Sequence, residues 1–286
     1  MTMLRFKQVD VFTDQPFRGN PVAVVLGADG LSGEAMQRMA AWTNLSETTF
    51  VLAPTQAGAH YRLRIFTPRA ELPFAGHPTI GSAHAVLEAG LAKPEAGVLR
   101  QECAGGLIAL SAEGGRLWAR APQPRVARLD GRYVPELEQA LGAPVAGQPQ
   151  VVNVGPTWLV ADLGDAMRVD LLMPEMAAIA KLSGPLGLTG VTVFGATGGG
   201  EAAVHVRSFA PAHGVAEDPV CGSGNVSVAA CLARTGLAAR IGSAYVARQG
   251  MALGRDGRVA IRIHADGAID FGGHAVTCVD GTLRAG

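Results

Sequence analysis

Hydrophobic and polar residues alternate along much of the first half of the chain, a pattern typical of strands with one buried face. The stretches with this pattern are 6–13 (FKQVDVFT), 21–27 (PVAVVLG), 48–54 (TTFVLAP) and 61–68 (YRLRIFTP). The first two flank 14–20 (DQPFRGN), whose Pro, Gly and Asn are common turn residues. The pattern therefore predicts a first half that is rich in strands.

A helical period replaces this alternation in 32–44 (SGEAMQRMAAWTN), where Ser32 is the expected N-cap. Residues three and four apart in this segment would share one face: Met36, Met39, Ala40 and Thr43. The second half has a similar segment at 173–183 (MPEMAAIAKLS). We expect one amphipathic helix in each half.

Two further helices are expected at 78–91 and 224–235, and both are apolar on nearly every side. A helix with Ala, Val, Ile and Leu all round and few charges is normally enclosed by protein. A sheet that curls around a central helix would bury each of them.

These two helices belong to a longer internal repeat. Glu71–Ala92 (ELPFAGHPTIGSAHAVLEAGLA) matches Glu217–Ala238 (EDPVCGSGNVSVAACLARTGLA) at a constant offset of 146 residues. Identical residues at this offset include Glu71 and Glu217, Pro73 and Pro219, Gly76 and Gly222, Gly90 and Gly236, and Leu91 and Leu237. The repeat predicts that the chain contains two copies of one domain.

The repeat continues upstream at an offset of 143 residues. There 64–68 (RIFTP) meets 207–211 (RSFAP), and 45–50 (LSETTF) meets 188–193 (LTGVTV). The change of offset places a three-residue insertion within 212–216 (AHGVA).

The division between the two copies is expected near 119–132 (ARAPQPRVARLDGR), where Pro and Arg interrupt the strand pattern. We therefore expect an N-terminal domain at 1–121 and a C-terminal domain at 122–269. A last strand near 270–286 is expected to pack back on the first domain.

Composition narrows the choice of partners. The chain has 286 residues, 48% of them hydrophobic, and its 24 Lys and Arg balance 24 Asp and Glu without any basic run. This argues against nucleic acid and anionic membranes as partners. No apolar run approaches the roughly 20 residues of a membrane helix, and the first residues do not have the layout of a signal peptide. We expect a soluble cytoplasmic protein.

The cysteines do not suggest a metal centre or a disulfide framework. Cys103, Cys221, Cys231 and Cys278 form no C-x-x-C pair and have no His at zinc-finger spacing. No metal site is predicted.

A glycine-rich turn opens each buried helix, and this favours an anion as ligand. The first N–H groups of a helix are unpaired and carry about half a positive charge. Glycines at 76, 222 and 224 would let a small carboxylate approach them. Two such helix starts could converge on one cleft if the halves face each other. The alternative is that these glycines only pack helix against strand.

Four polar residues occur in one copy but not in the other. Glu47 aligns with Gly190, His77 with Ser223, Asp218 with Leu72 and Cys221 with Ala75. A carboxylate such as Glu47 in a closed apolar cleft would have a raised pKa, as a general acid or base requires. The alternative is an ordinary exposed carboxylate at a strand start.

The motifs resemble those of the phenazine-biosynthesis PhzF-like proteins over nearly the whole chain and in the expected order. The matching blocks are 19–25 (GNPVAVV), 44–51 (NLSETTFV), 64–83 (RIFTPRAELPFAGHPTIGSA) and 217–225 (EDPVCGSGN). The resemblance implies the diaminopimelate epimerase-like fold, an α+β fold with two pseudo-symmetric domains. In each, a mostly antiparallel sheet is rolled around a central helix, and the active site lies between the domains.

The resemblance also implies a cofactor-free isomerase acting on a small carboxylate, and a homodimer. The type member converts trans-2,3-dihydro-3-hydroxyanthranilate to its ketone tautomer. Glu47 matches the family's proton-shuttling glutamate, with His77 and Asp218 as its polar partners. The remaining expected substrate-binding residues are Asn20, Ser46, Gly76, Gly222, Ser223, Gly224 and Cys221. No nicotinamide or flavin is expected, and no G-x-G-x-x-G turn follows a strand.

Two departures from the family pattern keep alternatives open. Cys221 stands where Thr is common, which resembles the cysteine-dependent amino-acid epimerases and racemases of the same fold, and a helix start would lower its thiol pKa. A second thiol is missing, because the aligned residue is Ala75, and Cys221 is also expected to be a small buried residue that only fills space. In 248–257 (RQGMALGRDG), Asp256 and Gly257 replace the usual Pro-Ser, so this block is expected to be structural only. A racemase and a non-catalytic metabolite-binding protein are the alternatives.

Overall fold

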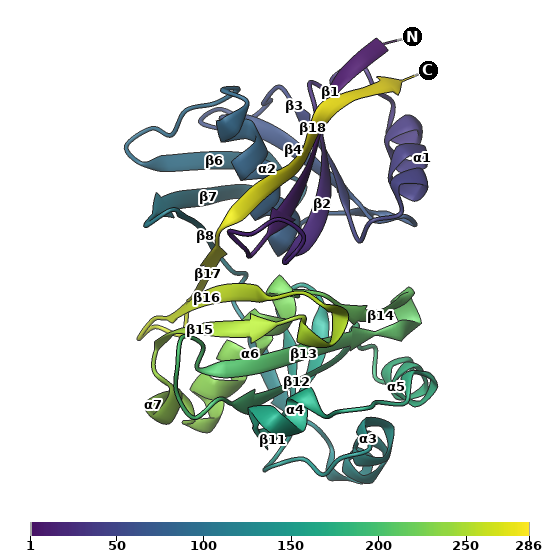
Figure 1. Ribbon diagram of the computed structural model, residues 1–286, viewed down its shortest axis with the longest axis vertical. Helices are drawn as coiled ribbons and strands as arrows, with labels where there is room; N and C mark the ends of the chain where they lie inside the picture. Colours follow the sequence, from purple (N-terminus) through teal and green to yellow (C-terminus); the bar gives the residue numbers. More distant parts are fainter. Residues whose placement is uncertain (1, 286) are drawn as a thin grey trace. The chain divides into compact units, whose positions relative to one another are not determined.

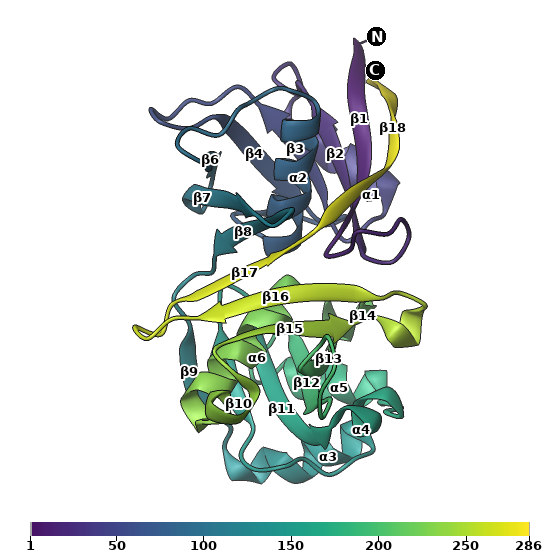
Figure 2. The same ribbon diagram turned by 60° about the vertical axis from the view of Figure 1, so that its left-hand side comes forward.

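The computed structural model describes residues 2–285, which form two compact units. Unit 1 comprises the described residues up to Arg120 together with those from Gly272 onward, and unit 2 is Ala121–Phe271. Figures 1 and 2 label most of the helices and strands of both units.

Unit 1 is built on a mostly antiparallel sheet, in which β2–β3 and β4–β6 are the parallel pairs. Its strands are β1 (Thr2–Val11), β2 (Asn20–Leu26), β3 (Thr48–Leu52), β4 (Tyr61–Phe66), β5 (Glu71–Leu72), β6 (Val98–Cys103), β7 (Gly106–Glu113), β8 (Arg116–Arg120) and β18 (Ala275–Ala285). The strands expected at 6–13, 21–27, 48–54 and 61–68 are all present. β1 ends at Val11 because Phe12 has a positive φ of 66°.

Two helices complete unit 1, α1 (Gly33–Thr43) and α2 (Gly76–Glu88). The expected N-cap of α1 is confirmed, since the Ser32 hydroxyl accepts a hydrogen bond from Ala35 N at 3.2 Å. α2 is buried over most of its length, as its apolar pattern predicts. It starts two residues earlier and ends sooner than the predicted 78–91, because Gly90 has a φ of 67° and cannot continue the helix.

Unit 2 repeats this plan with additional short helices. Its strands are β9 (Arg125–Arg128), β10 (Gln150–Asn153), β11 (Thr157–Asp165), β12 (Gly190–Ala196), β13 (Val204–Ala210), β14 (Val215–Asp218), β15 (Ala244–Gln249), β16 (Gly257–Ile263) and β17 (Ile269–Gly273), whose last two residues belong to unit 1. Its helices are α3 (Val134–Leu141), α4 (Ala166–Asp170), α5 (Met176–Ser183), α6 (Gly222–Thr235) and α7 (Ala238–Ile241). Three 3₁₀ helices are η1 (Gly131–Tyr133), η2 (Pro211–His213) and η3 (Met251–Leu253). The central helix α6 is buried from Gly222 to Leu232 apart from Ser223.

Strand pairing follows the sequence repeat residue by residue. Thr48 of β3 pairs with Phe66 of β4, and the residues 143 positions later, Val191 of β12 and Phe209 of β13, pair in the same way. The parallel pairs also correspond, β2–β3 with β11–β12 and β4–β6 with β13–β15. η2 overlaps the insertion that the change of offset predicts within 212–216. The duplication seen in the sequence is therefore a duplication of fold.

Each central helix comes very close to its sheet at one glycine. A Cβ on Gly81 of α2 would lie 2.5 Å from Val22 Cγ1, and a Cβ on Gly224 of α6 would lie 2.4 Å from Ser208 Oγ. Both distances are well inside van der Waals contact. At Gly224 the packing explanation of the glycine therefore applies, whatever ligand the helix start may receive.

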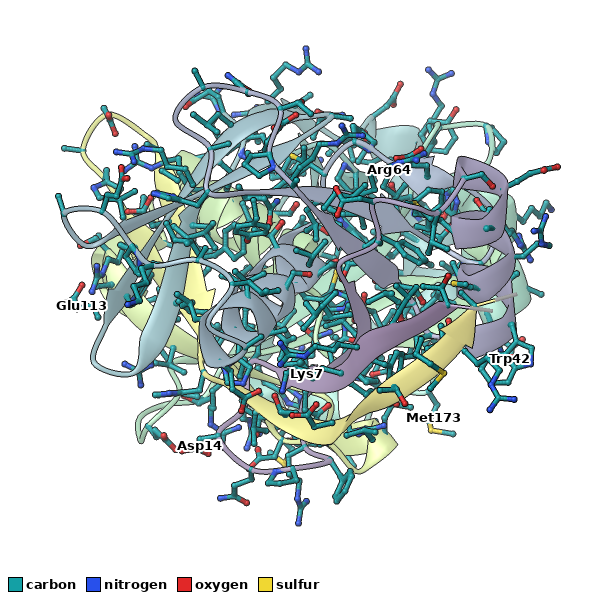
Figure 3. All side chains as sticks on the ribbon, turned by 90° about the horizontal axis from the view of Figure 1, so that it is seen from above. Lys7, Asp14, Trp42, Arg64, Glu113 and Met173 are labelled. Atoms are coloured by element: carbon teal, nitrogen blue, oxygen red, sulfur yellow. The ribbon has the colours of Figure 1, made fainter. Side chains whose placement is uncertain are left out.

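The C-terminal strand β18 pairs with β1 in unit 1, and Lys7 of β1 is opposite Asp280 of β18. Lys7 is labelled in Figure 3. Only 2% of Lys7 is exposed, and its Nζ lies 2.8 Å from Glu88 Oε2 and 2.6 Å from Asp280 Oδ2. The buried ammonium is thus compensated by two carboxylates, one from α2 and one from β18. None of the helices within residues 2–285 is long and apolar enough to cross a membrane.

Candidate functional site

In unit 1, Glu47 and His77 lie together. Glu47 comes directly before β3, and His77 is the second residue of α2. Their side chains are 16% and 6% exposed, and Glu47 Oε2 lies 3.4 Å from His77 Nε2. The carboxyl group is therefore largely shielded from solvent and faces the imidazole that the sequence paired with it.

Burial keeps the His77 imidazole neutral. It lowers the pKa of His77 from 6.5 to about 3, and a hydrogen bond to the backbone of Pro21 only partly offsets this effect. Proline has no N–H, so the imidazole must donate to the Pro21 carbonyl. Within residues 2–285, Nε2 has no hydrogen-bond partner of good geometry, so we assign this donor as Nδ1. Nε2 then directs its lone pair toward Glu47.

The other expected residues of unit 1 lie at the ends of neighbouring elements. Asn20 is the fully buried first residue of β2, and Ser46 is half-buried in the bend before Glu47. Gly76 begins α2, and Ala75 supplies no side-chain hydrogen bond to the helix start. The first amides of α2 thus have no N-cap side chain.

In unit 2, Asp218 and Cys221 form a second polar group. Asp218 ends β14, and its Oδ1 accepts a hydrogen bond from Val220 N at 3.1 Å. Burial raises the pKa of Asp218 from 3.8 to about 6, although hydrogen bonds from the Cys221 thiol and the Val220 N–H oppose the shift. The carboxyl group can therefore change its protonation state close to neutral pH.

Cys221 is the N-cap of α6, and its Sγ accepts a hydrogen bond from Gly224 N at 3.3 Å. The prediction of a lowered thiol pKa was wrong. Burial, followed by the nearby Asp218 carboxylate, raises the pKa of Cys221 well above its usual value, and these effects outweigh the helix start. Cys221 is therefore a protonated thiol at neutral pH.

Gly222 and Ser223 form the first turn of α6 with Gly224. The Ser223 hydroxyl accepts a hydrogen bond from Trp158 Nε1 at 3.0 Å, across from β11. The sequence reasoning did not find Trp158, which lies 65 residues before Ser223 in the chain. The structure thus collects Asp218, Cys221, Gly222, Ser223 and Gly224 around one helix start in unit 2.

A bidentate Arg–Glu pair holds the strand that leads into each central helix. Arg64 Nε and a terminal nitrogen donate to Glu71, both at 2.7 Å, and Arg207 donates likewise to Glu217 at 2.9 and 2.8 Å. The sequence analysis missed both pairs as functional supports. The signal was present, because the repeat aligns Arg64 with Arg207 and Glu71 with Glu217.

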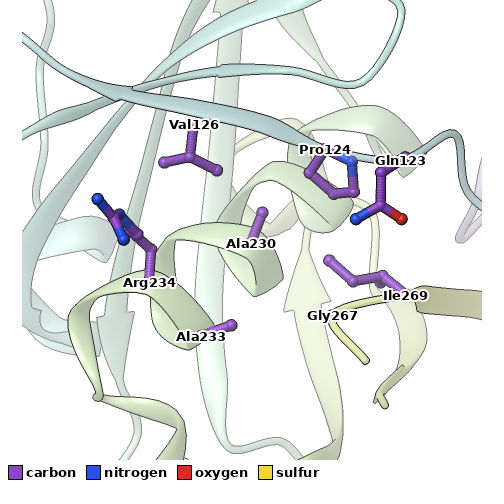
Figure 4. A pocket seen from close by; sticks show the side chains of 8 residues that line it. All are labelled: Gln123, Pro124, Val126, Ala230, Ala233, Arg234, Gly267 and Ile269. Atoms are coloured by element: carbon purple, nitrogen blue, oxygen red, sulfur yellow. The ribbon is translucent and has the colours of Figure 1, made fainter. Parts of the chain in front are cut away.

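A pocket of about 300 Å³ lies elsewhere on unit 2, and Figure 4 shows its lining. Ala230, Ala233 and Arg234 come from the second half of α6, whereas Asp218 and Cys221 are at its beginning. This pocket is thus not part of the candidate site. No group of His, Cys, Asp and Glu in residues 2–285 is arranged to hold a metal ion.

Comparison with known proteins shows one matching family and several similar proteins. The PhzC-PhzF family model, described as "Phenazine biosynthesis-like protein", matches residues 9–281. Antisense-enhancing sequence 1 of Schizosaccharomyces pombe is 40% identical over 98% of this chain and 99% of its own length. Trans-2,3-dihydro-3-hydroxyanthranilate isomerase of Pseudomonas aeruginosa is 35% identical over 98% of this chain and 99% of its own length.

A solved structure is also similar. The PhzF-family phenazine biosynthesis protein of Bacillus anthracis superposes with a TM-score of 0.86 at 25% identity, covering 99% of this chain and 100% of that one. A solved hydroxyproline epimerase of Agrobacterium vitis shares the fold at 15% identity, with a TM-score of 0.66, covering 99% of this chain and 91% of that one. The expected epimerase-like α+β fold with two pseudo-symmetric domains is therefore confirmed.

Fold and sequence together define an isomerase-type enzyme of the epimerase-like fold. The chain belongs to the PhzF-like phenazine-biosynthesis family, as its motifs indicated.

Proposed function

We propose that the chain is a cofactor-independent isomerase that moves a proton between two carbons of a small, cyclic, unsaturated carboxylate. The observation that carries the proposal is the shielded Glu47 carboxyl 3.4 Å from the neutral imidazole of His77. The similarity to an enzyme named for trans-2,3-dihydro-3-hydroxyanthranilate supports this compound as a test substrate.

In the proposed reaction, Glu47 removes a proton from a carbon activated by a conjugated diene. The electron pair shifts along the diene, and Glu47 returns the proton to another carbon on the same face. No electrons are lost or gained in total, and the atoms of substrate and product are the same. The Nε2 lone pair of His77 can accept a hydrogen bond from the protonated form of Glu47, which is the form present after Glu47 has taken the proton.

The remaining residues are proposed to bind the substrate. N–H groups at the helix starts are proposed to attract a carboxylate, those of Gly76 and His77 in unit 1 and those of Gly222 and Ser223 in unit 2. Asn20 and Ser46 of unit 1 and Asp218 of unit 2 are each proposed to bind polar groups of the substrate. Gly224 and Cys221 would shape the backbone of the α6 start.

The racemase alternative has little support. It needs two thiols that exchange protons, but the residue aligned with Cys221 is Ala75, and the Cys221 thiol is protonated. A racemase would exchange the α-hydrogen of an amino acid in deuterated water and would lose this exchange in Cys221→Ala. The isomerase proposal expects neither result.

The decisive experiment is turnover of trans-2,3-dihydro-3-hydroxyanthranilate in deuterated water, followed by NMR. We expect deuterium at the carbon that receives the proton, and a loss of at least about 100-fold in turnover for Glu47→Gln, since general acid–base groups contribute on the order of 10²–10⁴. Glu113→Gln is the matched control, because Glu113 is an exposed carboxylate on β7. Equal turnover in Glu47→Gln and wild type would refute the assignment.

Two further expectations remain proposals. We propose that the enzyme is a homodimer, as the family resemblance implies, and that it acts in the cytoplasm. Sedimentation equilibrium would test the first and cell fractionation the second.

A further inference from the structure

We propose that Gln249, the last residue of β15, is a positioning residue that fixes Asp218 and the first turn of α6 relative to each other. This inference rests on the proposed function in one respect only, namely that Asp218 binds substrate. The contacts themselves all lie within unit 2.

Gln249 is fully buried and uses both ends of its amide. Its Oε1 accepts hydrogen bonds from Cys221 N at 3.1 Å and from Asn225 Nδ2 at 2.8 Å. Its Nε2 donates to the backbone carbonyl of Asp218 at 2.9 Å. The Gln249 side chain thus links Asp218 to Cys221, the N-cap of α6, and to Asn225 in its first turn.

The orientation of this amide is fixed by chemistry. A backbone N–H can only donate, so the atom facing Cys221 N must be the Gln249 oxygen. The Gln249 nitrogen then faces the Asp218 carbonyl, which can only accept. Asn225 is oriented in turn, and its Nδ2 also donates to the Cys221 carbonyl at 2.9 Å. A buried network with assigned donors and acceptors is rigid, because any broken link leaves an unpaired polar group.

The backbone that follows Gln249 is packed against the same turn. A Cβ on Gly250, which has a φ of 101°, would lie 2.6 Å from the Pro219 carbonyl oxygen. A Cβ on Gly257 would lie 2.3 Å from Val220 Cγ2. These contacts give a reason for glycine at 257, where the resembling family block usually has Ser. The segment 248–257 thus packs directly against residues 218–221.

Among residues 2–285, this side-chain bridge is found only in the copy that carries Asp218. Gln249 pairs with Gly257 across the β15–β16 hairpin, as Cys103 pairs with Gly106 across the β6–β7 hairpin of unit 1. Cys103 therefore occupies the corresponding position, and its short side chain donates to the Gly106 carbonyl. A purely structural need of the duplicated fold would apply to both copies. The difference between Gln249 and Cys103 therefore favours a role for Gln249 that is specific to Asp218 and Cys221.

The test uses Gln249→Met, which is similar in length but makes no hydrogen bonds, and Gln150→Met as a matched control. Gln150 is a buried glutamine of unit 2, 3% exposed, whose Nε2 donates to the Gln148 carbonyl. Two measurements need no substrate: the titration of the ¹³C-labelled Asp218 carboxyl by NMR, and amide hydrogen exchange of the peptide 217–225 by mass spectrometry.

In Gln249→Met we expect the Asp218 pKa to move from about 6 toward 3.8, as water reaches the loosened carboxyl. Exchange of 217–225 should accelerate about tenfold or more, since several buried hydrogen bonds are lost. Turnover of trans-2,3-dihydro-3-hydroxyanthranilate should fall about 10–100-fold in kcat with a smaller change in KM. Gln150→Met should leave the titration and the exchange of 217–225 as in wild type.

Gln249→Glu decides the matter if Gln249→Met does not fold. As a carboxylate it keeps an acceptor for Cys221 and Asn225 but loses the donor to Asp218, so exchange resolved by NMR should rise more at the amides of Asp218 and Val220 than at those of 222–225. Wild-type titration and exchange in a folded variant would overturn the proposal. A wild-type enzyme that leaves the test substrate unchanged would refute the proposed substrate, while titration and exchange would still decide the role of Gln249.

Discussion

Oε2 of Glu47 lies 3.4 Å from Nε2 of His77, and burial holds this imidazole in its neutral form. The pair joins the end of a loop before β3 to the first turn of α2, both within unit 1. A carboxyl group in such a setting can exchange a proton without a charged histidine beside it. The relationship has consequences that can be measured without knowing the substrate.

His77 should make the protein less stable in mild acid. Its pKa is 6.5 in the unfolded chain and about 3 in the fold, so the unfolded state binds a proton that the folded state does not. The resulting loss of stability is absent above pH 6.5 and grows as the pH falls toward 3. Between pH 7.5 and 5, His77→Asn should lose less stability than wild type, as followed by urea denaturation.

His213→Asn serves as the control for this experiment, because His213 is exposed at the end of η2. Its stability should change with pH as in wild type. An identical pH dependence in His77→Asn and wild type would contradict a neutral, buried His77.

Asp218 should make the protein less stable as the pH rises, which is the opposite of the effect of His77. Its pKa is raised from 3.8 to about 6, so its contribution to stability is full below 3.8 and is lost as the pH rises through 6. Asp218→Asn does not have this loss. Its free energy of unfolding relative to wild type should therefore rise by up to about 3 kcal/mol between pH 4 and pH 8. Thermal unfolding at several pH values checks it, with exposed Asp14→Asn as control. A constant difference between Asp218→Asn and wild type would argue against a raised pKa.

Cys221 should react slowly with alkylating reagents. Its thiol is buried and its pKa is raised, so little thiolate is present at pH 7.5. Iodoacetamide labelling followed by mass spectrometry should modify the half-buried Cys278 before Cys221. Faster labelling of Cys221 would restore the reactive-thiol interpretation.

The two Arg–Glu pairs should differ in their contribution to stability. Arg207 and Glu217 are each 7% exposed, and Arg207 also donates to the carbonyls of Val169 and Leu172. Arg207→Leu leaves Glu217 buried without its cation and should cost about 3–5 kcal/mol. Arg64→Leu is the matched variant and should cost about 0–1 kcal/mol, since the Arg64 and Glu71 side chains are 24% and 38% exposed. Chemical denaturation measures both, and equal losses would contradict this account.

Gly224 should not accept a side chain. A Cβ there would lie 2.4 Å from Ser208 Oγ and 3.0 Å from Thr192 Oγ1, two hydroxyls that are hydrogen-bonded to each other. Gly224→Ala should therefore cost about 1–3 kcal/mol. Gly131→Ala is a suitable control, because nothing lies within 4 Å of its Cβ position. A Gly224→Ala variant as stable as Gly131→Ala would show that α6 can move away from the sheet.

Much of the architecture was already determined by local chemistry and by the repeat. Ser32 caps α1 because a side-chain oxygen can reach the third amide beyond it, and this depends only on neighbouring residues. The apolar composition of 78–91 and 224–235 required two enclosed helices. The pairing of Glu47 with His77 was visible as two polar positions that the duplication did not repeat.

Only the tertiary structure decided the protonation states and the supports of the site. The thiol of Cys221 follows burial rather than the helix start, and desolvation depends on every neighbour that surrounds it. Trp158 and Gln249 contact the start of α6 from strands far away in the chain, at Ser223 and Cys221. Such contacts arise from the register of distant strands, and no local pattern of residues encodes them.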